Sequence, residues 1–351
     1  MRTTSGWFWG LFCFVLNCPC PAAAQELGSA RATSDPPVLF NLPTKTLGGQ
    51  QFWSDVYFEG GWHIQKNALS HHYRLLDPGN TRQAWGTFEQ CTASLDAKRH
   101  AGEVQPYQGR VVILLHGLNR THTSMNLMAD KLRTEHGFQT INFQYASSRR
   151  TVQDHADALA GVIDGLGPDV TEIHFVAHSL GNLVVRNYLH QRQNLAAGHA
   201  PDLRLSRMVM LGPPNQGSQL ARLLKGNLAF RAIAGDSGQQ LSRHWAELAD
   251  ELAIPPFPFA IVAGGGESEN VYERVVFEGP SDWVVAVAET SLPGAALHLQ
   301  LPVTHTFMME DPRIINITAN FLNDKIDEAR DVTRPTPDAR PRTNPAVSGS
   351  N

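Results

Sequence analysis

The stretch Glu172–Tyr188, EIHFVAHSLGNLVVRNY, decides the fold. It begins as an apolar strand, turns sharply at Ala177–Gly181 (AHSLG), and continues as a helix with apolar side chains on one side. A strand, a tight turn with a central serine and a helix form the context that holds an exposed nucleophile. Because the strand and helix backbones nearly touch, small residues are needed two positions before and after the serine, where Ala177 and Gly181 stand. We therefore predict that Ser179 lies at the tip of the turn.

Composition limits the kinds of protein to consider. The chain has 351 residues, of which 42% are hydrophobic and 18% charged, as expected for one large globular domain or two small ones. Its formal net charge of -4 gives no basic footprint for nucleic acid. No apolar run is as long as a membrane span.

Residues 1–24 are typical of a secretory signal peptide, with an early positive charge, the apolar run Trp7–Leu16 and three alanines at the end. We expect this leader to be removed and the protein to be secreted or periplasmic. Lipidation at Cys18 or Cys20, or retention of the leader as an anchor, are the alternatives. Removal leaves Cys91 as the single cysteine, which excludes an intrachain disulfide in the mature chain.

Residues 52–95 contain short segments rich in aromatic and β-branched residues, separated by Gly60–Gly61 and the turn Asp77–Asn80. This pattern predicts two to four antiparallel strands with tight turns, the last at Trp85–Gln90. A polar linker is expected over 97–108.

From residue 110 onward, apolar strands alternate with helices. This order predicts right-handed βαβ units and a mostly parallel sheet flanked by helices, within one α/β domain over 25–330. The tail 331–351 is rich in Pro, Thr, Arg and Asp and is expected to be disordered. The expected strands are Arg110–His116, Phe138–Tyr145, Ile173–Val176, Leu205–Leu211, Phe259–Ala263 and Leu297–Leu301, and the expected helices are Ser124–Thr134, Thr151–Leu166 and Pro312–Leu322.

Residues 215–254 form an insert of roughly three helices, interrupted by Gly226, Gly235 and Gly238. The insert follows the strand after the serine's own strand. Its position places it above the carboxyl edge of the sheet, where ligands bind in open α/β folds. Two interpretations stay open, a cap over the active site and a packed helical insert with no gating role.

A serine nucleophile needs a histidine base and an acid that orients the base, in the chain order serine, acid, histidine. His305 comes just after the last expected strand, whereas His298 lies inside that strand and is interpreted as a packed or edge residue. Asp282 lies in a tight Gly-Pro-Ser-Asp loop that runs straight into apolar residues, where an acid would be held in place. We predict the triad Ser179, Asp282 and His305. The other candidate acids, in a more polar segment interpreted as solvated, are Glu267, Glu269, Glu273 and Glu278.

An oxyanion hole needs two backbone N–H donors. One belongs to the residue after the serine, and the other comes from the loop that follows the strand two before the serine's strand. That loop reads His116-Gly117-Leu118-Asn119, in which Gly117 lets the backbone turn closely. The N–H groups of Leu118 and Leu180 are therefore the predicted donors. His116 is interpreted as structural.

Six stretches together resemble the lipases and esterases of the α/β-hydrolase superfamily, over about residues 110–322. The resemblance implies an α/β-hydrolase fold and a serine hydrolase that cleaves carboxylic esters through an acyl-enzyme, without a cofactor. It implies the same triad and the same two oxyanion donors. The stretches, in chain order, are HGLNRTHTSM, QYASSRRTV, VAHSLGNLVV, LGPPNQGSQLA, SDWVV and VTHTFMM.

The expected substrate is a small-molecule or lipid ester, cleaved by a lipase or a carboxylesterase, with peripheral contact to lipid surfaces as a further option. An acyltransferase or amidase with the same triad, and a non-catalytic binding protein on the same fold, are the alternatives. No metal site is expected. His71 and His72 are adjacent and point to opposite faces of a strand, and the other histidines lack clustered ligands.

Overall fold

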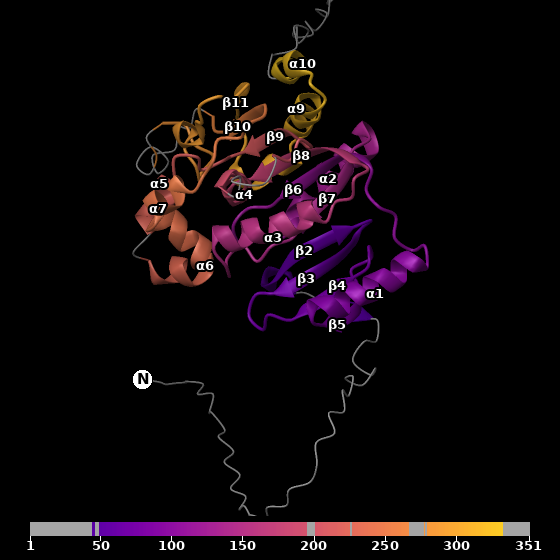
Figure 1. Cartoon of the computed structure of the whole chain (residues 1–351). Helices are drawn as coiled ribbons and strands as arrows, with labels where there is room; N and C mark the ends of the chain where they lie inside the picture. The colour runs from indigo at the N-terminus through magenta and orange to yellow at the C-terminus, as the bar shows by residue number, and fades with distance from the viewer. Residues whose placement is uncertain are drawn as a thin grey trace, which may run out of the picture. The chain divides into compact units, whose positions relative to one another are not determined.

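The computed structural model describes residues 44–45, 49–194, 201–224, 227–266, 277 and 279–332. Its centre is a parallel sheet of six strands in the order β11-β10-β9-β8-β6-β7 (Figure 1). This sheet confirms the predicted fold class. The strands are β6 (Gly109–Leu115), β7 (Gln139–Phe143), β8 (Val170–His178), β9 (Leu205–Leu211), β10 (Phe259–Gly264) and β11 (Leu297–Leu301).

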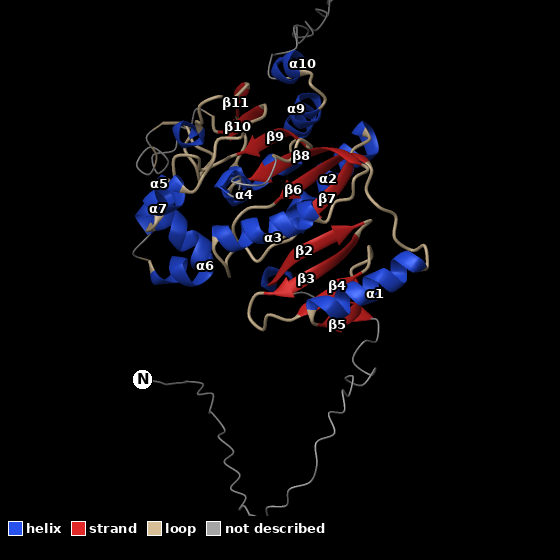
Figure 2. Ribbon diagram, in the orientation of Figure 1, coloured by secondary structure: helices blue, strands red, loops and turns tan. Residues whose placement is uncertain are grey.

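Helices cover both faces of this sheet (Figure 2). Successive side chains of β6 point to opposite faces, so Val111 and Ile113 join one apolar core while Val112 and Leu114 join the other. Burial on both sides explains why the strands are continuous apolar runs in the sequence. The first core includes α3 (Val152–Asp164) and α4 (Leu180–Asn194), and the second includes α2 (Asn126–His136), α9 (Pro312–Leu322) and α10 (Ile326–Asp331).

Helix ends follow local sequence signals. The Thr151 side chain accepts a hydrogen bond from Asp154 N, and this capping box begins α3. Gly137, at φ 71°, ends α2 in the left-handed conformation that glycine adopts readily. Asp311 caps α9, whose first residue is Pro312. These signals account for the close agreement between the expected and observed helices.

A second sheet is antiparallel and has the order β1-β5-β4-β3-β2. Asp55 of β2 connects this sheet to the end of β7, because its carboxylate accepts from Gln144 N at 2.7 Å. Helix α3 packs beside β2 with its Gly161, where a Cβ would lie 2.6 Å from the carbonyl oxygen of Val56. The strands are β1 (Thr44–Lys45), β2 (Trp53–Glu59), β3 (Trp62–Asn67), β4 (Tyr73–Leu76) and β5 (Thr81–Gly86).

One expected strand is wrong. The segment Trp85–Gln90 is a strand only to Gly86, and helix α1 (Phe88–His100) replaces both the rest of that strand and the start of the expected linker. Thr87 and Gln90 form a capping box that begins the helix. Cys91 and Leu95, one helical turn apart, are then buried against the antiparallel sheet. The aromatic Phe88 suggested a strand, but the capping signal and the four-residue spacing prevail.

The insert contains three helices, as expected: α5 (Gln219–Leu223), α6 (Leu228–Ser242) and α7 (Trp245–Asp250). Gly235 kinks α6 at φ 59° and ψ -151°, where a Cβ would overlap the carbonyl oxygen of Ser148. Four short 3-10 helices complete the described elements: η2 (Gln50–Phe52), η3 (His122–Met125), η6 (Val287–Thr290) and η7 (His305–Glu310).

The expected leader 1–24 lies outside the described residues, as does the expected tail beyond Val332. Within the described part of the chain, each helix is too short or too polar to cross a membrane.

Candidate active site

Ser179 occupies the sharp turn between β8 and α4, as predicted. Its φ of 51° places a residue with a side chain in the left-handed region, which costs free energy and is typical of functional sites. The turn is held because Ser179 N donates to the Leu211 carbonyl at 2.9 Å and Asn182 N donates to the Ser179 carbonyl at 3.1 Å. The serine is half-buried and lines a cavity.

The close approach that requires small residues is visible at two glycines. A Cβ on Gly181 would lie 2.8 Å from Leu115 Cβ and 2.9 Å from the His116 carbonyl oxygen. A Cβ on Gly117 would lie 2.8 Å from His178 Nδ1 and 3.2 Å from Ser179 Cβ. The loop after β6 therefore touches the serine turn, because β6 and β8 are neighbours in the sheet.

Asp282 and His305 are hydrogen-bonded to each other. His305 Nδ1 donates to Asp282 Oδ2 at 2.6 Å, and His305 N donates to the Asp282 carbonyl at 3.0 Å. The second carboxylate oxygen, Oδ1, accepts from the backbone N–H groups of Val284 at 3.0 Å and Val285 at 2.7 Å. Asp282 is 1% exposed, so its carboxylate is desolvated and fixed by three donors. With Nδ1 donating to a carboxylate, His305 Nε2 is the ring nitrogen left to accept a proton.

The ends of neighbouring strands bring these residues together. Gly212 follows β9 and Gly264 ends β10, and a Cβ on either would crowd Asp282, at 3.1 Å from Oδ2 and 2.7 Å from Cβ respectively. His305 comes just past β11. The carboxyl edge of a parallel sheet is where ligands bind in open α/β folds.

Ser179 and His305 line the same cavity, of about 240 Å³, at this edge. The helical insert supplies part of its wall through α5 and α6, which places the insert beside the serine. Most of the wall is apolar, from Pro214, Leu220, Ala221, Leu241, Val284 and Val285.

The predicted oxyanion residues flank the serine. Leu118 lines the cavity, and the buried Leu180 is the first residue of α4. The N–H groups in the first turn of a helix have no acceptor within the helix, so they are available to an anion. Their role stays a prediction.

The other residues considered at the sequence level are the histidines His298 and His116 and four glutamates. His298 lies on the edge strand β11, where its Nε2 is 3.0 Å from Thr290 Oγ1, as the packed or edge interpretation expected. The four glutamates considered as alternative acids lie outside the described residues. His116 is fully buried and stacks on Tyr145 with ring centroids 4.1 Å apart, and burial lowers its pKa to about 3. A neutral, packed His116 agrees with the structural interpretation.

His178 is a functional candidate that the sequence did not reveal. Its Nε2 lies 2.9 Å from the His305 carbonyl, to which it donates as a neutral imidazole. Burial first, and then the charges of His305 and Arg120, hold the His178 pKa well below its usual value. The two histidine rings lie 4.6 Å apart. His178 therefore positions the backbone of the predicted base, although in the sequence it is only one residue of the serine turn.

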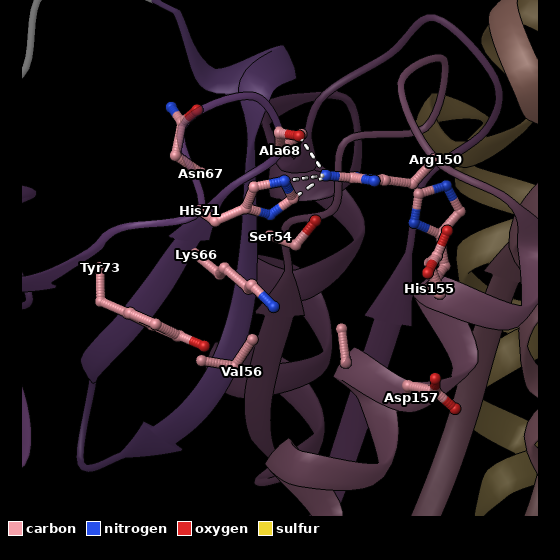
Figure 3. A pocket seen from close by; sticks show the side chains of 12 residues that line it. Ser54, Val56, Lys66, Asn67, Ala68, His71, Tyr73, Arg150, His155 and Asp157 are labelled. Atoms are coloured by element: carbon pink, nitrogen blue, oxygen red, sulfur yellow. Dashed lines mark hydrogen bonds between the residues drawn. The ribbon is translucent and has the colours of Figure 1, made fainter. Parts of the chain in front are cut away.

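A larger cavity, of about 370 Å³, lies between β2, β3 and α3. Figure 3 shows Arg150 reaching across to the Ala68 carbonyl and His71, with Lys66 extending into the space beside them. Its serine, Ser54, accepts a hydrogen bond from Ala146 N. Two histidines, His71 and His155, also line this cavity, but among the described lining residues neither is hydrogen-bonded to a carboxylate as His305 is to Asp282. Among the described residues, no group of three His, Cys, Asp or Glu side chains is arranged to hold a metal ion.

Comparisons of the sequence with known protein families and curated proteins assign no function to this chain. Residues 78–228 match the model of a domain of unknown function, DUF7379. No curated protein matches the chain.

Among solved structures, the mature lipase BlEst2 from Bacillus licheniformis is 18% identical, with a TM-score of 0.46 over 61% of this chain and 89% of that one. Phospholipase PlaB from Legionella pneumophila is 18% identical, with a TM-score of 0.47 over 65% of this chain and 63% of that one. Est1E from Butyrivibrio proteoclasticus, solved with ferulic acid bound, is 17% identical, with a TM-score of 0.42 over 64% of this chain and 92% of that one. Likenesses this low do not identify an activity, so the chemistry rests on this chain's own residues.

Proposed function

We propose that this protein is a serine hydrolase that cleaves carboxylic esters through an acyl-enzyme intermediate. The observation that carries the proposal is that His305, which is hydrogen-bonded to the buried Asp282, lines one cavity with Ser179, whose backbone is held at positive φ. Each element has an ordinary structural explanation when it stands alone. Their convergence at the carboxyl edge of one sheet is what a nucleophile, its base and the orienting acid require.

In the proposed reaction, His305 Nε2 accepts the Ser179 hydroxyl proton while Oγ bonds to the ester carbonyl carbon. The carbonyl oxygen becomes an anion that the N–H groups of Leu118 and Leu180 stabilise. His305 returns the proton to the leaving alcohol as the C–O bond breaks, which leaves an acyl-serine. His305 Nε2 then takes a proton from a water molecule as the water oxygen bonds to the acyl carbon. It returns that proton to Ser179 Oγ as the bond between the acyl carbon and Oγ breaks, which releases the acid and restores the serine. Asp282 stays ionised and stabilises the imidazolium.

The cavity favours short acyl groups. At about 240 Å³ it lies below the roughly 300–1,000 Å³ of pockets that enclose drug-sized ligands, and its wall is mainly apolar. We therefore infer a carboxylesterase preference for short chains over a lipase preference for long ones.

Hydrolysis rates on p-nitrophenyl esters of graded chain length test the proposal. We expect turnover that is greatest for short chains and lost in Ser179→Ala, with an unchanged circular dichroism spectrum in that variant. Full activity in Ser179→Ala would exclude the mechanism, and a maximum at long chains with activation at a lipid interface would change the assignment to a lipase.

Export through the leader 1–24 belongs to the same proposal. N-terminal sequencing of protein recovered from the periplasm or the medium tests it. A chain that begins at the residue after the leader supports export, and an intact Met1 contradicts cleavage.

A further inference from the structure

The loop after β6 places a positive charge beside the predicted nucleophile. Arg120 lines the same cavity as Ser179 and His305, and it is partly buried. The backbone N–H of Arg120 donates to the Gly117 carbonyl at 3.3 Å, which closes a turn directly after the residue that contacts the serine turn. Its charge helps to lower the His178 pKa, which agrees with a guanidinium close to the serine turn.

Arg120 differs from the other arginines that face inward. Arg186 is buried and donates to the Asn215 side chain and the Ala253 carbonyl, and Arg74 donates to Gln65. Within the described residues, the Arg120 side chain makes no hydrogen bond, ion pair or aromatic contact. A guanidinium carries five N–H donors, so it is free to bind an anion that enters the cavity.

Two depressions meet at Arg120. The apolar cavity around Ser179 is one, and a more open polar depression of about 520 Å³ is the other. Leu118 and Arg120 line both. The remaining lining of the polar depression carries amide and hydroxyl groups, from Asn119, Thr121, Thr123 and Ser124.

This layout divides an ester into two parts. With the carbonyl carbon at Ser179, one substituent lies along the apolar wall and the other passes Arg120 toward the hydroxyl-lined depression. Carboxylate and phosphate oxygens match the planar fork of a guanidinium and also accept hydrogen bonds from hydroxyl groups.

We propose that Arg120 is a specificity-determining residue that selects esters carrying a negatively charged group near the scissile bond. This inference rests on the proposed ester hydrolysis and names the substrate class for that same site. A neutral ester fills only the apolar cavity, whereas an anionic ester also pairs with the guanidinium.

The test compares three chromogenic esters. p-Nitrophenyl butyrate is neutral, its ring-carboxylated analogue carries the charge on the leaving group, and the mono-p-nitrophenyl ester of glutaric acid carries it on the acyl group. The measured quantity is the ratio of kcat/KM for an anionic ester to that for the neutral ester. Comparing this ratio between a variant and the wild type cancels the intrinsic reactivity of the substrates.

We expect Arg120→Gln to lower this ratio for one of the two anionic esters, mainly through KM, because the charge pair with the substrate is lost. The decrease should be only about tenfold, since solvent screens a partly exposed charge pair. Arg120→Lys keeps the positive charge but not the planar fork of the guanidinium, so its ratio should lie between those of the wild type and Arg120→Gln. Raising the salt concentration should reduce the ratio in the wild type and leave it unchanged in Arg120→Gln. Arg133→Gln, which removes an exposed charge paired with Asp130 on α2, is the matched control and should keep the wild-type ratio.

Loss with the ring-carboxylated ester places the anion on the alcohol side, and loss with the glutarate ester places it on the acyl side. An unchanged ratio for both esters in Arg120→Gln would overturn the inference. The proposed function is judged separately, because it fails only if the wild type hydrolyses none of the three esters or if Ser179→Ala retains the activity.

Discussion

The substitution Asp282→Asn isolates what the buried carboxylate does. Asparagine has nearly the same shape, and its oxygen still accepts the two N–H groups of Val284 and Val285 that now bind Asp282 Oδ1. Its NH₂ group, however, faces His305 Nδ1, where the carboxylate now accepts a hydrogen bond at 2.6 Å. Two donors cannot bind each other, so His305 is forced into the other tautomer, with its proton on Nε2.

With Nε2 already protonated, His305 cannot accept the proton of Ser179. Loss of the correct tautomer in serine hydrolases lowers kcat by about 10,000-fold. This corresponds to about 5 kcal/mol of transition-state stabilisation, at roughly 1.4 kcal/mol per factor of ten. Because the asparagine keeps the backbone contacts, we expect the free energy of unfolding to change by only about 1 kcal/mol.

The assay is kcat on p-nitrophenyl butyrate at pH 7, with urea unfolding of the same samples. The matched control is Glu289→Gln. Glu289 is a second buried acid in the region, and it accepts from Gln219 N at 2.6 Å and Ala286 N at 2.9 Å and is not hydrogen-bonded to His305. We expect this control to keep kcat within a few-fold of the wild type. A kcat in Asp282→Asn within tenfold of the wild type would refute the reasoning and return the role of the acid to another residue.

Three further predictions concern stability. Ser179→Gly should abolish hydrolysis yet stabilise the fold by about 1 kcal/mol, because glycine accepts the φ of 51° without strain; a lower Tm than the wild type would contradict this. Gly181→Ala should cost about 1–3 kcal/mol in urea unfolding, because its Cβ would lie 2.8 Å from Leu115 Cβ, whereas Gly167→Ala, with no atom within 4 Å of the new Cβ, should cost nothing. Burial lowers the pKa of His155 to about 3, so its contribution to stability is present above pH 6.5 and is lost as the pH falls toward 3. At pH 5 the loss is about 2 kcal/mol, and His155→Gln should therefore show a flatter dependence of unfolding free energy on pH between 7 and 5 than the wild type.

Features set by neighbours in the chain were predictable from the sequence. The serine turn needs small residues at fixed offsets, and the parallel strands are apolar because both faces are covered. Ala177 and Gly181 predicted the turn. The predicted strand Leu205–Leu211 has the same bounds as β9. Helix α1 carried a readable signal too, in Thr87 and Gln90, but the aromatic residues Trp85 and Phe88 favoured a strand.

Features set by tertiary contacts were harder to predict. Asp282 could be ranked above the glutamates by its loop, but its hydrogen bond to His305 spans 23 residues and depends on how the loops after β10 and β11 meet. The contact of His178 with the His305 carbonyl spans 127 residues. No sequence pattern singles out Arg120. Its proposed role depends on its place in the cavity wall and on a side chain that is unpaired among the described residues, and both are tertiary features.

Covalent labelling of the wild type with a fluorophosphonate, followed by peptide mass spectrometry, tests the central claim most directly. A serine activated by His305 attacks the phosphorus atom, expels fluoride and remains phosphonylated. We predict stoichiometric labelling of the wild type on the peptide that contains Ser179, with parallel loss of ester hydrolysis, and no labelling of folded Ser179→Ala. An unlabelled wild type that still hydrolyses esters, or a label on another residue that accounts for the lost activity, would contradict the account.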